Sequence, residues 1–113
     1  MKKERRILKG IEFQKIIENK KFVVNQSFVI YYCKKQEKHA RIGISIGKRL
    51  GKAVQRNKVK RQVRMMFQDI LDKSLNNDMI CIVRAGYYQH TFSENKKLLE
   101  NLVFKVNIVD DES

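Results

Sequence analysis

The stretch RIGISIGKRLGKAVQRNKVKRQVRMMFQDIL, residues 41–71, decides the fold because its apolar period changes part-way along. Residues 41–47 alternate, which puts Ile42, Ile44 and Ile46 on one face of a strand and small or polar residues on the other. After a basic loop, apolar residues recur at helical spacing, at Val59, Val63, Met66, Phe67, Ile70 and Leu71. We therefore expect a strand whose isoleucine face is core, followed by a long helix whose apolar stripe packs on the sheet.

The sequence on either side of this stretch predicts further helices and strands. Residues 9–20 indicate a short amphipathic helix with Phe13 and Ile17 on one face, and residues 22–34, rich in β-branched and aromatic side chains, indicate a strand. Downstream, the predicted elements are a break at Asn76-Asn77-Asp78, a strand over residues 79–85 that Gly86 closes, and a helix over residues 92–109. The residues therefore predict an α/β (α+β) fold, a sandwich built on a single sheet.

Length and composition favour one small cytoplasmic domain. The 113 residues fit a single domain over 1–113, with a short acidic tail at 110–113. The longest apolar run, Phe28 to Cys33, is far below the roughly 20 residues that span a bilayer, and the N-terminal residues lack the pattern of a signal peptide. Cys33 and Cys81 lie in strand-like runs, which is typical of buried thiols in a reducing compartment, and no Cys-x-x-Cys motif indicates zinc.

The charge pattern points to a polyanionic partner. Lys and Arg number 25 against 12 acidic residues, so the formal net charge is +13. No Asp or Glu lies between Glu37 and Asp69, and this window holds Lys38, Arg41, Lys48, Arg49, Lys52, Arg56, Lys58, Lys60, Arg61 and Arg64. Surfaces that serve only solubility usually mix both signs. The window therefore favours nucleic acid over a membrane surface or plain solubility.

A helical wheel gathers part of this charge on one arc. At about 100° per residue, Asn57, Lys60, Arg61 and Arg64 fall together beside the apolar stripe, and we call these four residues the cationic arc. Arg56 falls near the apolar side in the first turn, whereas Lys58 and Gln62 lie elsewhere. Arg binds phosphate oxygens in bidentate fashion, Lys acts as a point charge, and Asn both donates and accepts hydrogen bonds. Such an arc predicts phosphate contacts, which give affinity and register rather than sequence readout.

Nothing in the sequence gives the polypeptide catalytic machinery of its own. Metal-dependent nucleases cluster carboxylates, whereas the acidic residues here are scattered. His39 and His90 are isolated, and neither Ser27 nor Ser45 has a histidine partner in sequence reach. Two other classes remain open: a non-catalytic RNA-binding protein of the ribosomal type, and a DNA-binding module that reads a groove with the basic helix. Against the second, the helix must pack its apolar stripe on the sheet, and no helix-turn-helix partner precedes it.

Residues 51–64 resemble the basic-helix motif of the bacterial ribonuclease P protein subunit, G-N-A-V-x-R-N-R-x-K-R-x-x-R. The matching residues are Gly51, Ala53, Val54, Arg56, Asn57, Lys60, Arg61 and Arg64. Lys52 stands where Asn is usual and Lys58 where Arg is common, and both replacements keep or add positive charge. Weaker similarity extends through residues 6–13, 28–31, 41–48 and 80–84.

The resemblance implies a fold and a function. The fold would have the order α-β-β-β-α-β-α with a left-handed βαβ crossover, against the usual handedness. The protein would join ribonuclease P RNA and promote removal of the 5′ leader from precursor tRNA, with no small-molecule substrate. The RNA and its Mg²⁺ would carry out the cleavage, and the polypeptide would contribute no metal ligand or catalytic residue.

The resemblance also implies two sets of binding residues. Contacts to the catalytic RNA would come from the basic loop and helix, at Lys48, Arg49, Lys52, Arg56, Asn57, Lys58, Lys60, Arg61 and Arg64. A cleft for the leader would be lined by Phe13, Ile17, Val29, Tyr31, Arg41 and Ser45. From the residues alone, the first four of these fit an ordinary core equally well, although the polar face around Arg41 and Ser45 favours a groove.

Overall fold

The computed structural model describes residues 10–34, 40–70 and 77–111. In chain order its elements are α1 (Gly10–Glu18), β1 (Phe22–Val24), β2 (Phe28–Lys34), β3 (Ile42–Ile46), the 3-10 helix η2 (Lys48–Leu50), α2 (Ala53–Ile70), β4 (Asn77–Val83), the 3-10 helix η3 (Ala85–Gln89) and α3 (Phe92–Asp111). Predictions on residues 6–9, Lys38, His39, Leu71, Asn76 and residues 112–113 lie outside the described residues. Within them, no helix is both long and apolar enough to span a membrane.

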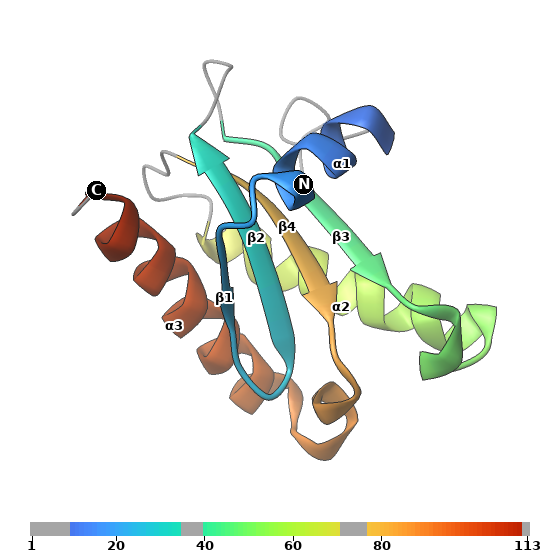
Figure 1. Cartoon of the computed structure of the whole chain (residues 1–113). Coiled ribbons are helices and arrows are strands. Elements are labelled where there is room, and N and C mark those ends of the chain that lie inside the picture. Colours follow the sequence, from blue (N-terminus) through green and yellow to red (C-terminus); the bar gives the residue numbers. More distant parts are fainter. Residues whose placement is uncertain (1–9, 35–39, 71–76, 112–113) are drawn as a thin grey trace.

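The four strands form one mixed sheet in the order β1-β2-β4-β3, which confirms the predicted single-sheet fold. β2 pairs antiparallel with both β1 and β4, whereas β3 runs parallel to β4. Helix α1 packs on one face, and α2 and α3 pack on the other (Figure 1). In Figure 1 the arrows of β3 and β4 point downward, β4 lies to the left of β3, and α2 lies behind them. The path from β3 through α2 to β4 is therefore left-handed, as the resemblance implied.

The strand predicted over residues 22–34 is two strands joined by a tight turn. The side-chain oxygen of Asn25 accepts hydrogen bonds from the backbone N–H groups of Ser27 and Phe28, both at 3.0 Å. The N–H of Asn25 also donates to the carbonyl of Phe28 at 2.9 Å. An Asn side chain that satisfies backbone donors in this way replaces strand pairing with a turn. β1 therefore folds back along the outer edge of β2.

Asn77 and Asp78 lie outside α2, as the predicted break at residues 76–78 requires, but the next strand begins at Asn77 rather than at residue 79. Asn77 and Asp78 open β4, pair with Lys34 and Cys33 of β2, and are each only 1% exposed. Asp78 is stabilised there because its carboxylate accepts the N–H of Arg41 at 2.8 Å and lies 3.2 Å from that residue's guanidinium. Arg41, just before β3, therefore offsets the cost of burying the Asp78 carboxylate inside the sheet.

The ends of the last two elements also differ from the sequence prediction. β4 stops at Val83, and the chain turns into η3 before Gly86 is reached. α3 continues to Asp111, so the first part of the predicted acidic tail at 110–113 belongs to this helix. β4 is an interior strand, flanked by β2 and β3, although it comes late in the chain.

Alternation along the strands divides the core in two. The larger cluster fills the space between the sheet, α2 and α3, and includes Phe28, Ile30, Phe67, Met79 and Leu99. The predicted isoleucine face joins it, with Ile42 and Ile46 buried and Ile44 packed at its edge. The smaller cluster joins α1 to the opposite face through Ile16 and Ile80, with Phe13, Tyr31, Cys33 and Ile82 partly buried around them.

The two cysteines lie on opposite faces of the sheet and form no disulfide with each other. Cys81 lies in the larger cluster, where burial raises the pKa of its thiol well above the ordinary value. Cys33 is only half-buried beneath α1. The prediction of a buried thiol therefore holds fully for Cys81 and partly for Cys33.

Candidate nucleic-acid interface

One flank of α2 is held against α3 and η3. The hydroxyl of Tyr87 donates to the side-chain oxygen of Gln62 at 2.7 Å, and Lys96 on α3 lies 2.6 Å from the carboxylate of Asp69. Because an α-helix turns once every 3.6 residues, the cationic arc lies on the flank opposite Gln62 and Asp69, away from α3. Asn57 and Arg61 are exposed there, and Lys60 and Arg64 are half-buried. The structure therefore brings the four arc residues together on one outward surface.

The charges of the arc are not neutralised by the chain's own described carboxylates. Across residues 10–34, 40–70 and 77–111, no ion pair involves Lys60, Arg61 or Arg64, whereas Asp78 and Asp69 are used by Arg41 and Lys96. The first turn of α2 carries no acidic residue either. The positive end of the helix dipole therefore adds to the positive charge at the start of α2.

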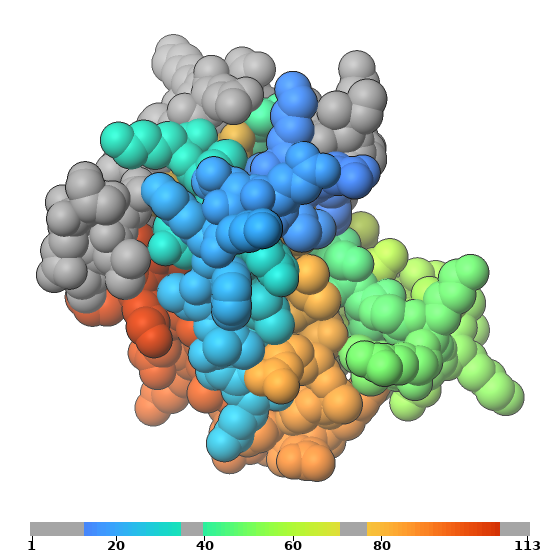
Figure 2. Space-filling view, in the orientation of Figure 1, coloured from blue at the N-terminus to red at the C-terminus, as the bar shows by residue number. Residues whose placement is uncertain are grey.

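The predicted loop residues lie at the N-terminal end of the same helix. Lys48 and Arg49 are exposed on η2, and Lys52 is exposed just before α2. Gly51 supplies the turn between them at a φ of 140°, which a residue with a side chain rarely adopts. In Figure 2 this segment, drawn in green, projects from the right side of the molecule. We call these three cations together with the cationic arc the basic surface.

Two predicted residues of this helix have different surroundings. Arg56 is half-buried, and its Nε donates to the carbonyl of Gly51 at 3.1 Å, so part of its donor capacity holds the loop against the helix. Lys58 is exposed on the flank that faces η3, where it lines a pocket rather than the basic surface. The helical wheel had already separated Lys58 from the arc.

The second predicted set lies on the sheet face that α1 partly covers. The register places Val24, Val29, Ile82 and Ser45 side by side in a row across the four strands, and we call this the open row. The neighbouring row holds Phe22, Tyr31, Ile80 and Gly43. The Phe13 ring lies on Gly43, where an added Cβ would be 2.5 Å from its Cζ. Ile17 remains exposed on α1. α1 therefore covers the neighbouring row at Ile80 and Gly43, whereas Phe22 stays exposed at the sheet edge and the open row stays partly exposed.

Arg41 is on this face but apart from the open row. Along this face the order is Arg41, Gly43, Ser45. The Phe13 ring covers Gly43 and so separates Arg41 from Ser45 in the open row. The Arg41 side chain is 14% exposed and paired with Asp78. The structure therefore brings Phe13, Ile17, Val29, Tyr31 and Ser45 to one area and holds Arg41 at its far side.

Arg84 and Phe22 are additional candidates that the sequence reasoning did not single out. Arg84 follows Ile82 on the same face, is exposed, and donates through Nη1 to the carbonyl of Asn25 at 2.5 Å. The alternation Ile80, Ile82, Arg84 in the last strand would have located it. The exposed Phe22 packs on Tyr31 with ring centroids 5.4 Å apart, and only the unpredicted hairpin places these two rings together.

The sequence and the fold match one family. A family model described as Ribonuclease P matches residues 1–107. The chain belongs to the ribonuclease P protein family. Relatives named ribonuclease P protein component include one from Mesoplasma florum, 45% identical across 93% of this chain and 97% of the relative. Another, from Limosilactobacillus reuteri, is 36% identical across 100% of this chain and 98% of the relative.

Solved structures of ribonuclease P proteins share the fold. A Staphylococcus aureus ribonuclease P protein, a mutant with defective mRNA degradation activity, superposes with a TM-score of 0.86 at 37% identity, covering 93% of this chain and 90% of that one. The protein from Thermotoga maritima gives a TM-score of 0.77 at 28% identity, covering 87% and 94%.

Family membership decides between the function classes that the sequence left open. Members are the protein component of ribonuclease P, the endoribonuclease that processes tRNA, so the ribosomal-type and DNA-binding alternatives are set aside. A ribonuclease P RNA is the partner that this membership implies. The polypeptide is therefore a subunit of a nuclease.

Proposed function

We propose that the chain binds the catalytic RNA of ribonuclease P through the basic surface and the 5′ leader of precursor tRNA through the open row. In this assignment it promotes the Mg²⁺-dependent endonucleolytic removal of the leader, while the RNA carries out the cleavage. The observation that supports it best is the cationic arc, whose side chains share the flank of α2 opposite α3 without an ion pair to a described carboxylate.

The basic surface suits a folded RNA backbone. Arg61 and Arg64 offer planar forks that match phosphate oxygens, and Lys60 supplies a compact charge beside Arg64. Asn57 adds a donor and an acceptor in the first half of the helix. The repulsion between these clustered cations costs stability in the free protein and is relieved when phosphates bind. This surface therefore supports affinity for RNA without requiring a particular base sequence.

The open row suits an unpaired strand. Its side chains from β1, β2 and β4 are apolar, the Phe22 and Tyr31 rings lie beside it, and Ser45 and Arg84 add polar groups at its margins. Single strands bind where bases can stack on aromatic rings beside a cationic rim. Arg41 has a smaller role in this assignment because Asp78 already balances its charge.

The polypeptide provides binding rather than metal chemistry. Among the described residues, no group of three or more His, Cys, Asp or Glu side chains is placed to hold a metal ion. These residues do not fit a resident metal site, so no step assigned to the polypeptide uses one, and the Mg²⁺ of the reaction would be held by the RNA and the substrate. Cys33 and Cys81 form no disulfide, which suits work in a reducing compartment, the cytoplasm.

The proposal is tested by reconstituting cleavage. The protein is mixed with a bacterial ribonuclease P RNA and labelled precursor tRNA at low Mg²⁺, and leader release should be faster than with the RNA alone. The double variant Arg61→Ala/Arg64→Ala should need more protein for the same stimulation. The control Lys97→Ala/Lys105→Ala removes the same charge from exposed positions on α3 and should behave like the unmodified protein.

Two outcomes would count against the proposal. Absence of stimulation at every protein concentration would refute the function itself. An equal loss in both double variants would mean that only total charge matters, and it would remove the assignment of the basic surface.

A further inference from the structure

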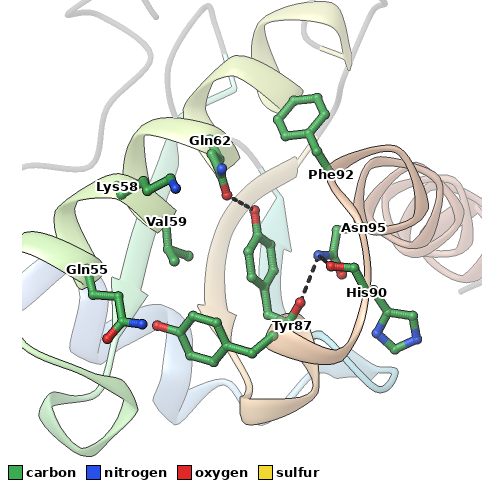
Figure 3. A pocket seen from close by; sticks show the side chains of 9 residues that line it. Gln55, Lys58, Val59, Gln62, Tyr87, His90, Phe92 and Asn95 are labelled. Atoms are coloured by element: carbon green, nitrogen blue, oxygen red, sulfur yellow. Dashed lines mark hydrogen bonds between the residues drawn. The ribbon is translucent and has the colours of Figure 1, made fainter.

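A pocket lies on the other flank of α2, away from both surfaces assigned above. It encloses about 250 Å³ between α2, η3 and the start of α3 (Figure 3). The lining residues are Gln55, Lys58, Val59, Gln62, Tyr87, Tyr88, His90, Phe92 and Asn95. Neither the cationic arc nor the open row contributes to it.

Hydrogen bonds fix the walls of this pocket. Tyr87 is held from two sides, because its hydroxyl donates to Gln62 and its carbonyl accepts from the amide of Asn95 at 3.0 Å (Figure 3). The side-chain oxygen of Asn95 in turn accepts the Ser27 hydroxyl at 2.6 Å. The hydroxyl of Tyr88 donates to the carbonyl of Leu50 at 2.6 Å. The pocket is therefore shaped before any ligand arrives, which lowers the entropy cost of binding.

The lining combines exposed aromatic rings with polar groups that have capacity left. Tyr88 and Phe92 are 44% and 39% exposed, which is high for large apolar rings. Gln62 uses its oxygen for Tyr87, so its NH₂ group is left to donate. The ring of His90 donates through Nδ1 to the carbonyl of Gly86 at 2.8 Å, which leaves Nε2 as an acceptor in the neutral ring.

The charge of the lining is also one-sided. Lys58 supplies an ammonium group, and none of the nine lining residues is an Asp or Glu. In Figure 3 the Lys58 side chain extends from α2 toward Tyr87. Aromatic faces, amide donors and acceptors, and one cation are the groups that bind an unpaired base and its phosphate.

We infer that this pocket binds one unpaired nucleotide of the RNA that docks on α2. The inference rests on the proposed function for its ligand, since α2 carries both the basic surface and one wall of the pocket. The base would stack on Tyr88 or Phe92, the amide of Gln62 would meet its polar edge, and Lys58 would meet the phosphate. A helix is about 10 Å across. A strand leaving the basic surface therefore reaches the pocket by crossing the exposed side of α2.

The test follows individual amide signals by NMR in the full chain. A short single-stranded oligoribonucleotide should shift the signals of η3, and a duplex of the same length should leave them in place because its bases are stacked inside. Tyr88→Leu and Phe92→Leu should each weaken the apparent affinity read at η3 by about fivefold or more. Phe104→Leu removes a ring that is 65% exposed elsewhere on α3 and should change nothing at η3.

A further variant separates stacking from the fixed wall. Tyr88→Phe keeps the ring but removes the bond to Leu50, so it should retain most of the affinity that Tyr88→Leu loses. Unshifted η3 signals, or equal shifts with single strand and duplex, would overturn the inference. If cleavage is stimulated normally while η3 stays unshifted, the pocket assignment fails and the proposed function survives. If stimulation is absent while the η3 signals shift, the proposed function fails and the pocket still binds a single strand.

Discussion

A methyl group added at Gly43 tests the contact that positions α1 on the sheet. In Gly43→Ala the new Cβ would lie 2.5 Å from Cζ and 2.7 Å from Cε2 of Phe13, so one of the two groups must move. The ring is the end of a half-buried side chain and can turn outward, so the cost is limited to the packing that it loses. Full burial of a Phe side chain contributes about 1.5–3 kcal/mol, and a half-buried ring therefore accounts for about 1 kcal/mol.

Urea unfolding of the unmodified protein and four variants measures this contact. Gly43→Ala should lower the free energy of unfolding by about 1 kcal/mol, or the melting temperature by about 4 °C. In a Phe13→Ala background the same change should cost nothing, because the obstructing ring is gone. Gly47→Ala is the matched control, since an added Cβ there has no neighbour within 4 Å. An equal loss in both backgrounds, or a loss at Gly47 as large as at Gly43, would refute the contact between α1 and β3.

Three further predictions concern the basic surface, the sheet face at Tyr31 and the buried Tyr87. Arg61→Ala/Arg64→Ala should flatten the slope of log affinity against log salt for ribonuclease P RNA by about 1.4–1.8, and an unchanged slope would mean that these side chains do not contact phosphates. Tyr31→Ala should reduce affinity for precursor tRNA about fivefold or more while sparing mature tRNA, and parallel losses on both would exclude a leader contact. Burial raises the pKa of Tyr87 to about 12, above the value near 10 of an unfolded chain, so this phenol stabilises the folded state below pH 10 and loses that contribution as the pH rises toward 12. Between pH 10 and 12 the free energy of unfolding, measured with denaturant, should fall less steeply for Tyr87→Phe than for the unmodified protein. Identical pH dependences would contradict the pKa shift.

The elements that the sequence predicted well are those whose pattern is local. Alternation over residues 41–47 and the apolar stripe of the next helix needed no distant partner, and both are present as β3 and α2. The start of β4 was predicted too late because Asn77 and Asp78 are turn-forming residues by type. Their burial depends on pairing with β2 and, for Asp78, on Arg41, which lies 37 positions away. Such partners are invisible to a local pattern.

The same division applies to the candidate interface. Helical spacing alone placed Lys60 beside Arg64, but the outward direction of the arc follows from the contacts of Gln62 and Asp69 with η3 and α3. On the sheet face, the missed turn at Asn25 hid the return of β1. The pairing of Phe22 with Tyr31 therefore emerged only in three dimensions.

The late position of β4 in the chain has a consequence for biosynthesis. Among the described strands β3 pairs only with β4, and β2 has only the three residues of β1 as a partner until β4 has been made. Most of the polypeptide must therefore leave the ribosome before the sheet can form. A nascent chain that ends before Asn77 lacks β4, the strand that pairs with both β2 and β3. The basic surface and the open row, which we propose as RNA-binding surfaces, would then form in the same cooperative step, so incomplete chains should lack both.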